Sequence, residues 1–273
     1  MSYQHSSRSE FSNVSFLDAY TFFLGSMEYN DIAEIINSQA KSFKFFLKSI
    51  VLDKETWNVL QEISKEEDVF IFSGIIRDFL SGEFDGVRDF DCVLKKKKTA
   101  HRIAIVKYMR SSQSYRINSF GGMKIQRDRN LLIDVWYLED TWGVKNKGIK
   151  PSPNALIETA FFNFSAIVYD FSAEKFIYSD HFCRFLKYKM MDVVYGENPN
   201  IPLCMVNIMR YWDLYRFSIS LNLISWIKDH YNDRLNLEKV QRMHYGKVLY
   251  SEEKIKLFLK YLIRVNDAQD RLG

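Results

Sequence analysis

The sequence predicts an α+β protein, with an α/β portion of short strands and helices followed by an all-helical portion. Short apolar runs of strand-forming residues, bounded by glycines, lie between residues 67 and 195, as in DVFIFSG at 68–74. From Asp180 onward, apolar residues recur at helical spacing instead. The segment GENPNIP at 196–202 is the best candidate linker between the two portions.

Each predicted element rests on a local pattern. Residues 31–66 predict two helices, the second with Asp53 as N-cap. IIRDFLSG at 75–82 predicts a short helix that ends at Gly82. Further elements follow from period and turn residues: a strand at 87–95, a helix at 100–112, two strands within 115–138 around a polar turn at 127–130, a hairpin within 160–179 that turns near 172–175, and helices within 180–196, 203–231 and 251–267.

Composition places the chain among packed globular proteins. The sequence is 47% hydrophobic and 16% aromatic, and its formal charge of +4 permits a polyanionic partner without requiring one. The three cysteines are far apart, and the polar N-terminus lacks the apolar core of a signal peptide. No apolar run approaches the roughly 18 residues of a membrane span. We therefore expect a soluble, cytoplasmic protein without a membrane partner, and the sequence leaves its oligomeric state open.

Two aspartates define the first candidate site. In VRDFDCVLK, Asp89 and Asp91 are two residues apart, so on a strand their side chains point to the same face. Neighbouring carboxylates repel each other unless a cation lies between them, and magnesium takes one or two carboxylates together with substrate phosphates. The alternative is a chance pair of charges on an exposed strand.

A third aspartate strengthens the interpretation as a metal site. Asp134 interrupts the apolar run NLLIDVWYL, which fits a strand buried on both sides, and an unpaired charge there is costly. With Asp89 and Asp91 it predicts a site for two magnesium ions that activates a hydroxyl and holds a triphosphate. The alternative is a core aspartate satisfied by backbone donors or by Arg88.

A glycine-arginine-aspartate element precedes the aspartate pair. Gly74 follows a strand and opens a helix, so backbone amides and the positive helix end can approach a phosphate. Arg77 lies one turn into this helix, where a guanidinium can grip phosphate oxygens, and Asp78 can orient an arginine or cap a loop. The alternative for such a junction is a tight turn.

The stretch FSGIIRDFLSGEFDGVRDFDCVL at 72–94 resembles the head-domain signature of the class II nucleotidyltransferases, the bacterial poly(A) polymerases and tRNA CCA-adding enzymes. Their pattern is roughly GGxVRDxLLG, a short gap, then DxD. FFNFSAIVYDF at 161–171 resembles a degraded form of their RRDFTINAMAYD element. The resemblance covers roughly residues 68–220. It implies a polymerase-β-like nucleotidyltransferase head, a small mixed sheet with helices, followed by helical neck and body domains.

On this basis we divide the chain into three parts. Residues 1–66 are expected to form a tail and helices that pack on the head, 67–195 the nucleotidyltransferase head domain, and 196–273 a helical neck/body-like domain.

The resemblance implies roles for individual residues. Asp89 and Asp91 match the metal-binding and catalytic pair, and Asp134 is the choice for the third carboxylate, which would help to deprotonate the acceptor hydroxyl. The expected nucleotide-binding residues are Ser73, Gly74, Arg77, Asp78, Arg210 and Arg216.

The sequence also departs from the family pattern. Ser73 stands in place of the first glycine, and Ala160 and Phe161 replace the basic pair before the second element. The family's EDxxR element, which reads the incoming base, has no clear counterpart here, so CCA addition is not the expected activity. Arg210 and Arg216 lie among aromatic residues at 211–217, a stripe that either stacks on bases or belongs to the core.

The leading hypothesis is an Mg2+-dependent nucleotidyltransferase that transfers a nucleotide from an NTP to an acceptor hydroxyl and releases pyrophosphate. RNA is the expected acceptor by resemblance, and a protein or a small molecule is the alternative acceptor. Two other hypotheses remain: a non-catalytic nucleotide- or RNA-binding regulator with the same fold, and a toxin- or defence-type enzyme that modifies tRNA or protein.

Overall fold

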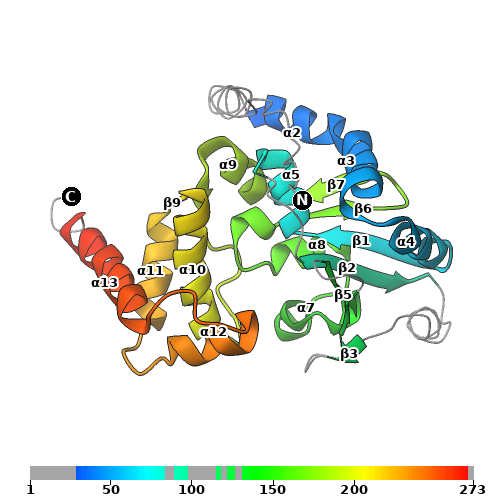
Figure 1. The fold of residues 1–273 in the computed structure, drawn as a ribbon. Helices are drawn as coiled ribbons and strands as arrows, with labels where there is room; N and C mark the ends of the chain where they lie inside the picture. The colour runs from blue at the N-terminus through cyan, green and yellow to red at the C-terminus, as the bar shows by residue number, and fades with distance from the viewer. Residues whose placement is uncertain (1–28, 84–88, 98–114, 118–121, 127–130, 270–273) are drawn as a thin grey trace, which may run out of the picture.

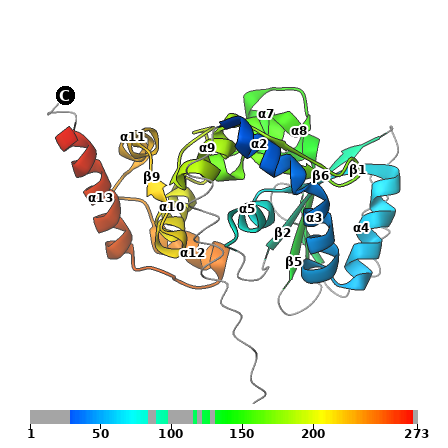
Figure 2. The ribbon, with the colours of Figure 1, turned by 90° about the horizontal axis from the view of Figure 1, so that it is seen from above.

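A computed structural model describes residues 29–83, 89–97, 115–117, 122–126 and 131–269, coloured in Figure 1. The strands of its seven-stranded sheet lie at one end of the molecule. The helices α10 (Ile201–Tyr215), α11 (Leu221–His230), α12 (Leu237–Tyr245) and α13 (Glu252–Gln269) lie at the other end, in both Figure 1 and Figure 2. The predicted α+β class with a helical C-terminal portion is therefore confirmed.

The helices before the sheet break more often than the sequence predicts. They are α2 (Tyr29–Ser38), α3 (Ala40–Phe46), a π-helical turn at Leu47–Val51, and α4 (Lys54–Glu66). Asp53 caps α4 as expected, because its Oδ1 accepts a hydrogen bond from the Thr56 amide at 2.8 Å.

Seven strands form one mixed sheet in the order β3-β4-β5-β2-β1-β6-β7. Strands β2 and β5 pair in parallel, and the other described pairs in this sheet are antiparallel. The strands are β1 (Glu67–Phe72), β2 (Asp89–Lys96), β3 (Tyr115–Ile117), β4 (Met123–Gln126), β5 (Leu132–Tyr137), β6 (Ile167–Asp170) and β7 (Lys175–Tyr178).

The region 115–138 contains three strands rather than the two predicted, because the short edge strand β3 pairs with β4. The predicted turn at 127–130 and the predicted helix at 100–112 lie outside the described residues. The predicted hairpin after residue 160 is confirmed as the antiparallel pair β6 and β7.

Helix α5 (Gly74–Ser81) follows β1 directly. Gly82 ends it with a φ of 73°, the left-handed conformation that glycine adopts without steric cost, so the predicted helix end is confirmed. At the other end, Ser73 has a φ of 58°, which is unusual for a residue with a side chain.

The two faces of the sheet are covered by different hydrophobic clusters. On one face, residues such as Ile71, Phe90 and Cys92 belong to the main core, which also contains side chains of α3, α4 and α5. On the other face, Phe70 and Val93 pack with the short helix α8 (Pro153–Glu158). In Figure 2, α3 and α5 lie beside strands β2 and β5, and α7 (Trp142–Lys147) lies beside α8.

The C-terminal helices are interrupted where the sequence suggests continuity. The expected helical stretch 203–231 is split into α10 and α11 because Arg216 takes a φ of 55° and ends α10. After α9 (Asp180–Tyr188), the two-residue strand β8 (Met190–Met191) pairs with β9 (Ser218–Ile219). Helix α12 is not apparent from the sequence pattern. Within the described residues, no helix is long and apolar enough to cross a membrane.

The main core contains buried residues of the sheet and also of α11 and α13, such as Leu223 and Leu259. This core extends across the predicted boundaries at residues 66 and 195, and the division into an N-terminal part that packs on the head, a head domain and a helical domain remains a prediction.

Candidate active site

The three predicted carboxylates lie on neighbouring strands. Asp91 of β2 and Asp134 of β5 are Cα partners in the parallel pair. Asp89 lies two residues before Asp91 on the same strand, so all three side chains belong to one face of the sheet. The predicted arrangement, two aspartates on one strand and a third on its neighbour, is therefore present. The strand β5 differs from expectation, since Ile133 and Val135 are buried while Asp134 lies on a partly open face.

The surroundings of Asp91 disfavour its ionised form. Burial, together with the negative charges of Asp134 and Asp89, raises the pKa of Asp91 to about 7, and Lys124 opposes this shift. On the other side, Asp91 pairs with Phe72 of β1, whose ring contacts Trp136 edge-on at 6.3 Å. A carboxylate that is removed from water and close to like charges is unfavourable when ionised, and a bound cation would remove that penalty.

Asp134 has a partner that the sequence did not reveal. Lys124 of β4 is its Cα partner, and the Lys124 Nζ lies 2.8 Å from Asp134 Oδ2. The other oxygen, Oδ1, is buried and has no hydrogen-bond partner in the structure. Burial raises the pKa of Asp134, and the hydrogen bond from Lys124 counteracts part of that rise.

The three carboxylates share a face but do not converge on one point. Among the residues that the structure describes, no set of three histidine, cysteine, aspartate or glutamate side chains is arranged to hold a metal ion. The donor types, the unpartnered Asp134 Oδ1 and the mutual repulsion at Asp91 fit a hard cation. Asp134 Oδ2 is instead paired with the Lys124 ammonium.

The start of α5 lies next to the carboxylates, because β1 ends at Phe72, the Cα partner of Asp91. The Ser73 hydroxyl donates to Ser165 Oγ at 2.8 Å, and the Ser73 amide donates to the Ile167 carbonyl. A Cβ added at Gly74 would meet no atom within 4 Å. The backbone at Gly74 is therefore open to a ligand. The amides of Ile76 and Arg77 donate to the Ser73 carbonyl at 3.0 Å, so the two leading amides, those of Gly74 and Ile75, are the ones that have no acceptor inside the helix.

Arg77 makes internal contacts rather than facing this open side. Its side chain is only 6% exposed, its NH2 lies 2.6 Å from Asp78 Oδ1, and it also donates to the Tyr215 hydroxyl at 3.3 Å. The guanidinium lies 5.0 Å from the ring centroids of Tyr211 and Tyr215 and 5.2 Å from that of Phe164. Arg77 and Asp78 thus form a buried ion pair between α5 and α10.

The two predicted arginines of the helical portion lie around α10. Arg210 stacks over Tyr245 of α12 at 5.0 Å. Arg216 is 71% exposed, lies over the Trp212 ring at 5.6 Å, and is 3.7 Å from Asp213 Oδ1. The aromatic stripe is largely core: Tyr211 and Tyr215 enclose Arg77, and Phe217 is buried.

Two features of the site were missed by sequence reasoning. The first is the Arg77 cage, the set of side chains of Asp78, Phe164, Tyr211 and Tyr215 around the Arg77 guanidinium. Its two tyrosines lie more than 130 positions from Arg77 in the chain, so no local pattern reveals the cage. Lys124 could have been found, because a hairpin centred on residue 129 pairs position 124 with position 134.

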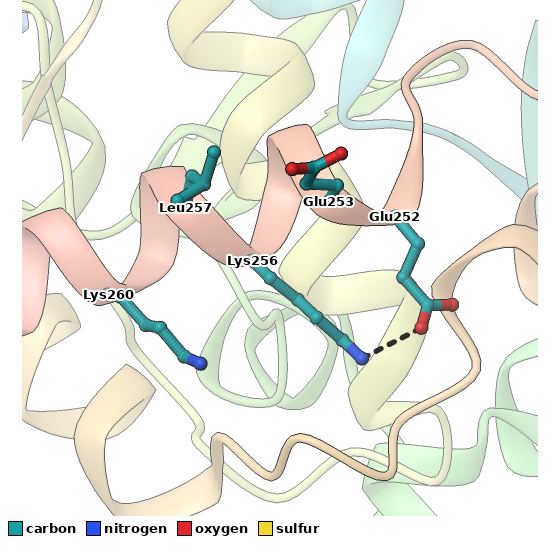
Figure 3. Close-up of a pocket in the computed structure, with 5 residues that line it drawn as sticks. All are labelled: Glu252, Glu253, Lys256, Leu257 and Lys260. Atoms are coloured by element: carbon teal, nitrogen blue, oxygen red, sulfur yellow. Dashed lines mark ion pairs between the residues drawn. The ribbon is translucent and has the colours of Figure 1, made fainter.

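A shallow depression of about 340 Å³ also lies on α13, lined by Glu252, Glu253, Lys256, Leu257 and Lys260 (Figure 3). Figure 3 shows its lining from this one helix, with Lys256 and Glu252 ion-paired at 2.8 Å. None of the predicted site residues lines it, and we assign it no role.

The fold resembles known structures. A CCA-adding enzyme in complex with CTP superposes with a TM-score of 0.55 at 15% identity, covering 77% of this chain and 52% of that one. The Thermotoga maritima CCA-adding enzyme complexed with tRNA superposes with a TM-score of 0.51 at 14% identity, covering 78% of this chain and 52% of that one.

This chain has the fold of the CCA-adding nucleotidyltransferases. It spans about half the length of the two enzymes above. No family model matches the sequence, and no curated protein matches it. The fold predicted for the head, a small mixed sheet with helices, is therefore confirmed.

Proposed function

We propose that this chain is an Mg2+-dependent nucleotidyltransferase that transfers a nucleotide from an NTP to an acceptor hydroxyl, with an RNA 3′ end as the acceptor. The observation that carries the proposal is the register of Asp91 and Asp134 on parallel strands, with Asp89 beside them and the start of α5 at their edge. The fold of enzymes solved with CTP and with tRNA supports the choice of NTP and RNA.

Asp89 and Asp91 would hold the magnesium ions, and Asp134 would join them once its carboxylate turns toward them. When bound, the ions supply charge neutralisation of the triphosphate and activation of the attacking hydroxyl. The pKa of Asp91 is raised to about 7 because its negative charge is poorly compensated. A bound cation would compensate that charge, so cation binding would favour loss of the proton.

The triphosphate would bind at the start of α5. The leading amides of the helix and its positive end favour an anion there, and the absence of a side chain at Gly74 leaves room for it. The Ser73–Ser165 hydrogen bond fixes the backbone that presents these amides. Ser73 and Gly74 thus keep their proposed nucleotide-binding roles.

Arg77 and Asp78 would act through the orientation of α5 rather than by contact with phosphate. Their ion pair is buried against Tyr211 and Tyr215, so a phosphate reaching Arg77 would have to displace an aromatic side chain or Asp78. Arg210 and Arg216 are the remaining candidates to contact the nucleotide, and Arg216 is the more exposed of the two.

A non-catalytic nucleotide- or RNA-binding protein is the second candidate function. The observation that favours it is the Lys124–Asp134 ion pair, which neutralises the third carboxylate at a place where no three described carboxylates are arranged to hold a metal ion. An intact Asp89–Asp91 pair beside an open helix start favours the enzyme, because a binding protein gains nothing from the repulsion at Asp91.

The test is incubation of the purified chain with Mg2+, each α-labelled NTP and total RNA. The enzyme predicts label transfer that is lost in an Asp89→Asn/Asp91→Asn variant. A wild-type chain that transfers no label but binds NTP would support the non-catalytic protein. Transfer that survives in the double variant would contradict the site assignment.

A further inference from the structure

The last helix carries an apolar stripe that faces away from the rest of the molecule. Leu257 and Tyr261 of α13 are both 64% exposed, and Val265 is 37% exposed. Residues four positions apart lie on one side of a helix, so these three side chains form a continuous α13 stripe. The opposite side of the helix is buried in the main core through Ile255 and Leu259. In both Figure 1 and Figure 2, α13 forms the outer edge of the molecule, at the end opposite the sheet.

Two charged side chains beside the α13 stripe lack a partner. Glu253 and Arg264 are exposed and make no ion pair, hydrogen bond or ring contact with the residues that the structure describes. The other described charges of α13 are engaged: Glu252 with Lys256, Lys260 with Asp233, Asp267 with Lys228, and Lys254 over the ring of Tyr250. Figure 3 shows Glu253 and Leu257 pointing to one side of α13, and Lys256 and Lys260 to another.

The order of these residues along α13 makes its exposed face self-complementary. Glu253 lies four residues before Leu257, and Arg264 lies three residues after Tyr261. When two copies of α13 lie antiparallel, with Leu257 of each copy against Tyr261 of the other, Glu253 of each copy comes level with Arg264 of the other. An apolar centre then has an ion pair at each end. A parallel pair would instead place glutamate beside glutamate and align the two helix dipoles unfavourably.

We propose that the exposed face of α13 is a dimerisation surface on which α13 of a second copy of this chain packs antiparallel. A second copy is the occupant because one two-fold axis satisfies the apolar stripe, Glu253 and Arg264 at once. A contact between two helices buries less than roughly 1,200 Å², the low end of specific interfaces, so the dimer is weak and forms at micromolar concentrations. The inference does not depend on the proposed function, since α13 lies at the end of the molecule opposite the sheet.

The first test exchanges the two charges. Sedimentation equilibrium across the micromolar range should show a monomer–dimer equilibrium for the wild type. Glu253→Arg or Arg264→Glu alone places like charges together at both ends of the helix pair and should weaken the dimer by about tenfold or more. The double variant restores opposite charges and should dimerise like the wild type. An equimolar mixture of the two single variants should do so too, because each mixed dimer again has glutamate against arginine at both ends.

The second test removes the apolar centre. Leu257→Ser/Tyr261→Ser should abolish dimerisation and leave the chain folded, as circular dichroism will show, because both side chains are largely exposed. Met243→Ser is the matched control, since Met243 is 76% exposed and lies on α12, away from this stripe. It should leave the dimer unchanged.

The outcomes decide the inference in each case. A wild-type chain that stays monomeric throughout the micromolar range overturns it and leaves the stripe to a different partner. Dimerisation that is unchanged in both single charge variants, or in Leu257→Ser/Tyr261→Ser, means that the copies associate through another surface, and also overturns it. A mixture of the single variants that does not recover the wild-type affinity contradicts the antiparallel arrangement. The label-transfer test of the proposed function is separate from all of these.

Discussion

Asp91 and Asp134 lie directly opposite each other on the parallel strands β2 and β5, on the partly open face of the sheet. This relationship brings together two charges from positions 43 residues apart in the chain. The pairing is unfavourable, since like charges directly opposite each other destabilise a strand pair. A functional reason is the simplest account of its presence.

The first prediction concerns the pH dependence of stability. Asp91 has a pKa of about 7 in the folded chain, against about 3.9 in the unfolded chain. Between these values the unfolded chain ionises while the folded chain keeps the proton, so the free energy of unfolding falls as pH rises. Asp91→Asn should therefore be more stable than the wild type at pH 8, by about 1–2 kcal/mol, and similar to it at pH 4.

Urea unfolding with EDTA at several pH values checks this prediction. Asp140→Asn is a control, because Asp140 is an aspartate paired with Lys145 away from the three carboxylates. If the unfolding free energies of the wild type and Asp91→Asn changed with pH in parallel, the pKa of Asp91 would not be raised in the folded chain.

The second prediction separates ligand binding from folding at Gly74. An added Cβ meets no atom within 4 Å, so Gly74→Ala should unfold at nearly the wild-type temperature. The same methyl group would stand where phosphate oxygens approach the backbone, and NTP affinity should fall by about tenfold or more. Equilibrium dialysis with labelled NTP and a thermal melt measure the two effects, and an unchanged affinity would place the triphosphate elsewhere.

The third prediction concerns the Arg77 cage. Arg77→Met leaves Asp78 as a buried carboxylate without its partner and should cost about 3 kcal/mol of unfolding free energy. Arg77→Lys should recover only part of this, because a lysine does not stack over Tyr211 and Tyr215 with a planar group. Denaturant unfolding provides the measurement.

Arg216→Met is the matched control for this cage. Its side chain is 71% exposed, so its unfolding free energy should change by no more than about 0.5 kcal/mol. Equal losses for Arg77→Met and Arg216→Met would contradict the assignment of Arg77 as a buried structural residue.

The fourth prediction concerns Lys189. Its Nζ is buried without a hydrogen-bond partner among the described residues, and burial lowers the pKa of Lys189 to about 8. The folded chain therefore loses this proton before the unfolded chain does, and stability contributed by this group rises between pH 8 and about 10.4.

Lys189→Met should abolish that rise and stabilise the chain by about 1 kcal/mol at pH 7. Lys187→Met on the same segment is the control, since the Lys187 Nζ lies over the ring of Tyr188, a residue that is 57% exposed. A pH profile of Lys189→Met that still rises between pH 8 and 10 would mean that another group causes the effect.

The sequence predicts those parts of the fold that depend on local signals. The Asp53 cap, the Gly82 helix end and the β6–β7 hairpin follow from a capping residue, a left-handed glycine and a turn between apolar runs. The strand placement of Asp89 and Asp91 follows from alternation. These patterns act within a few residues, so one sequence is enough to see them.

The parts that the sequence does not predict depend on contacts between distant residues. From the sequence alone, Arg77 is predicted to bind phosphate because it lies one turn into a helix. In the structure, Tyr211 and Tyr215 of α10 pack against its guanidinium instead. Lys124 is one lysine among many until the register of β4 and β5 places it opposite Asp134. Helix α12 and the edge strand β3 depend on packing and pairing that their own residues do not specify.

The most direct test of the account is the position of a metal ion. Crystals of the chain grown with Mn2+ and a non-hydrolysable NTP should show anomalous density between the carboxylates of Asp89 and Asp91, at roughly 2.1 Å from their oxygens. The triphosphate should lie against the first turn of α5. Anomalous density elsewhere, or nucleotide bound without an ion at these aspartates, would contradict the central claim that this carboxylate pair is a metal site for nucleotidyl transfer.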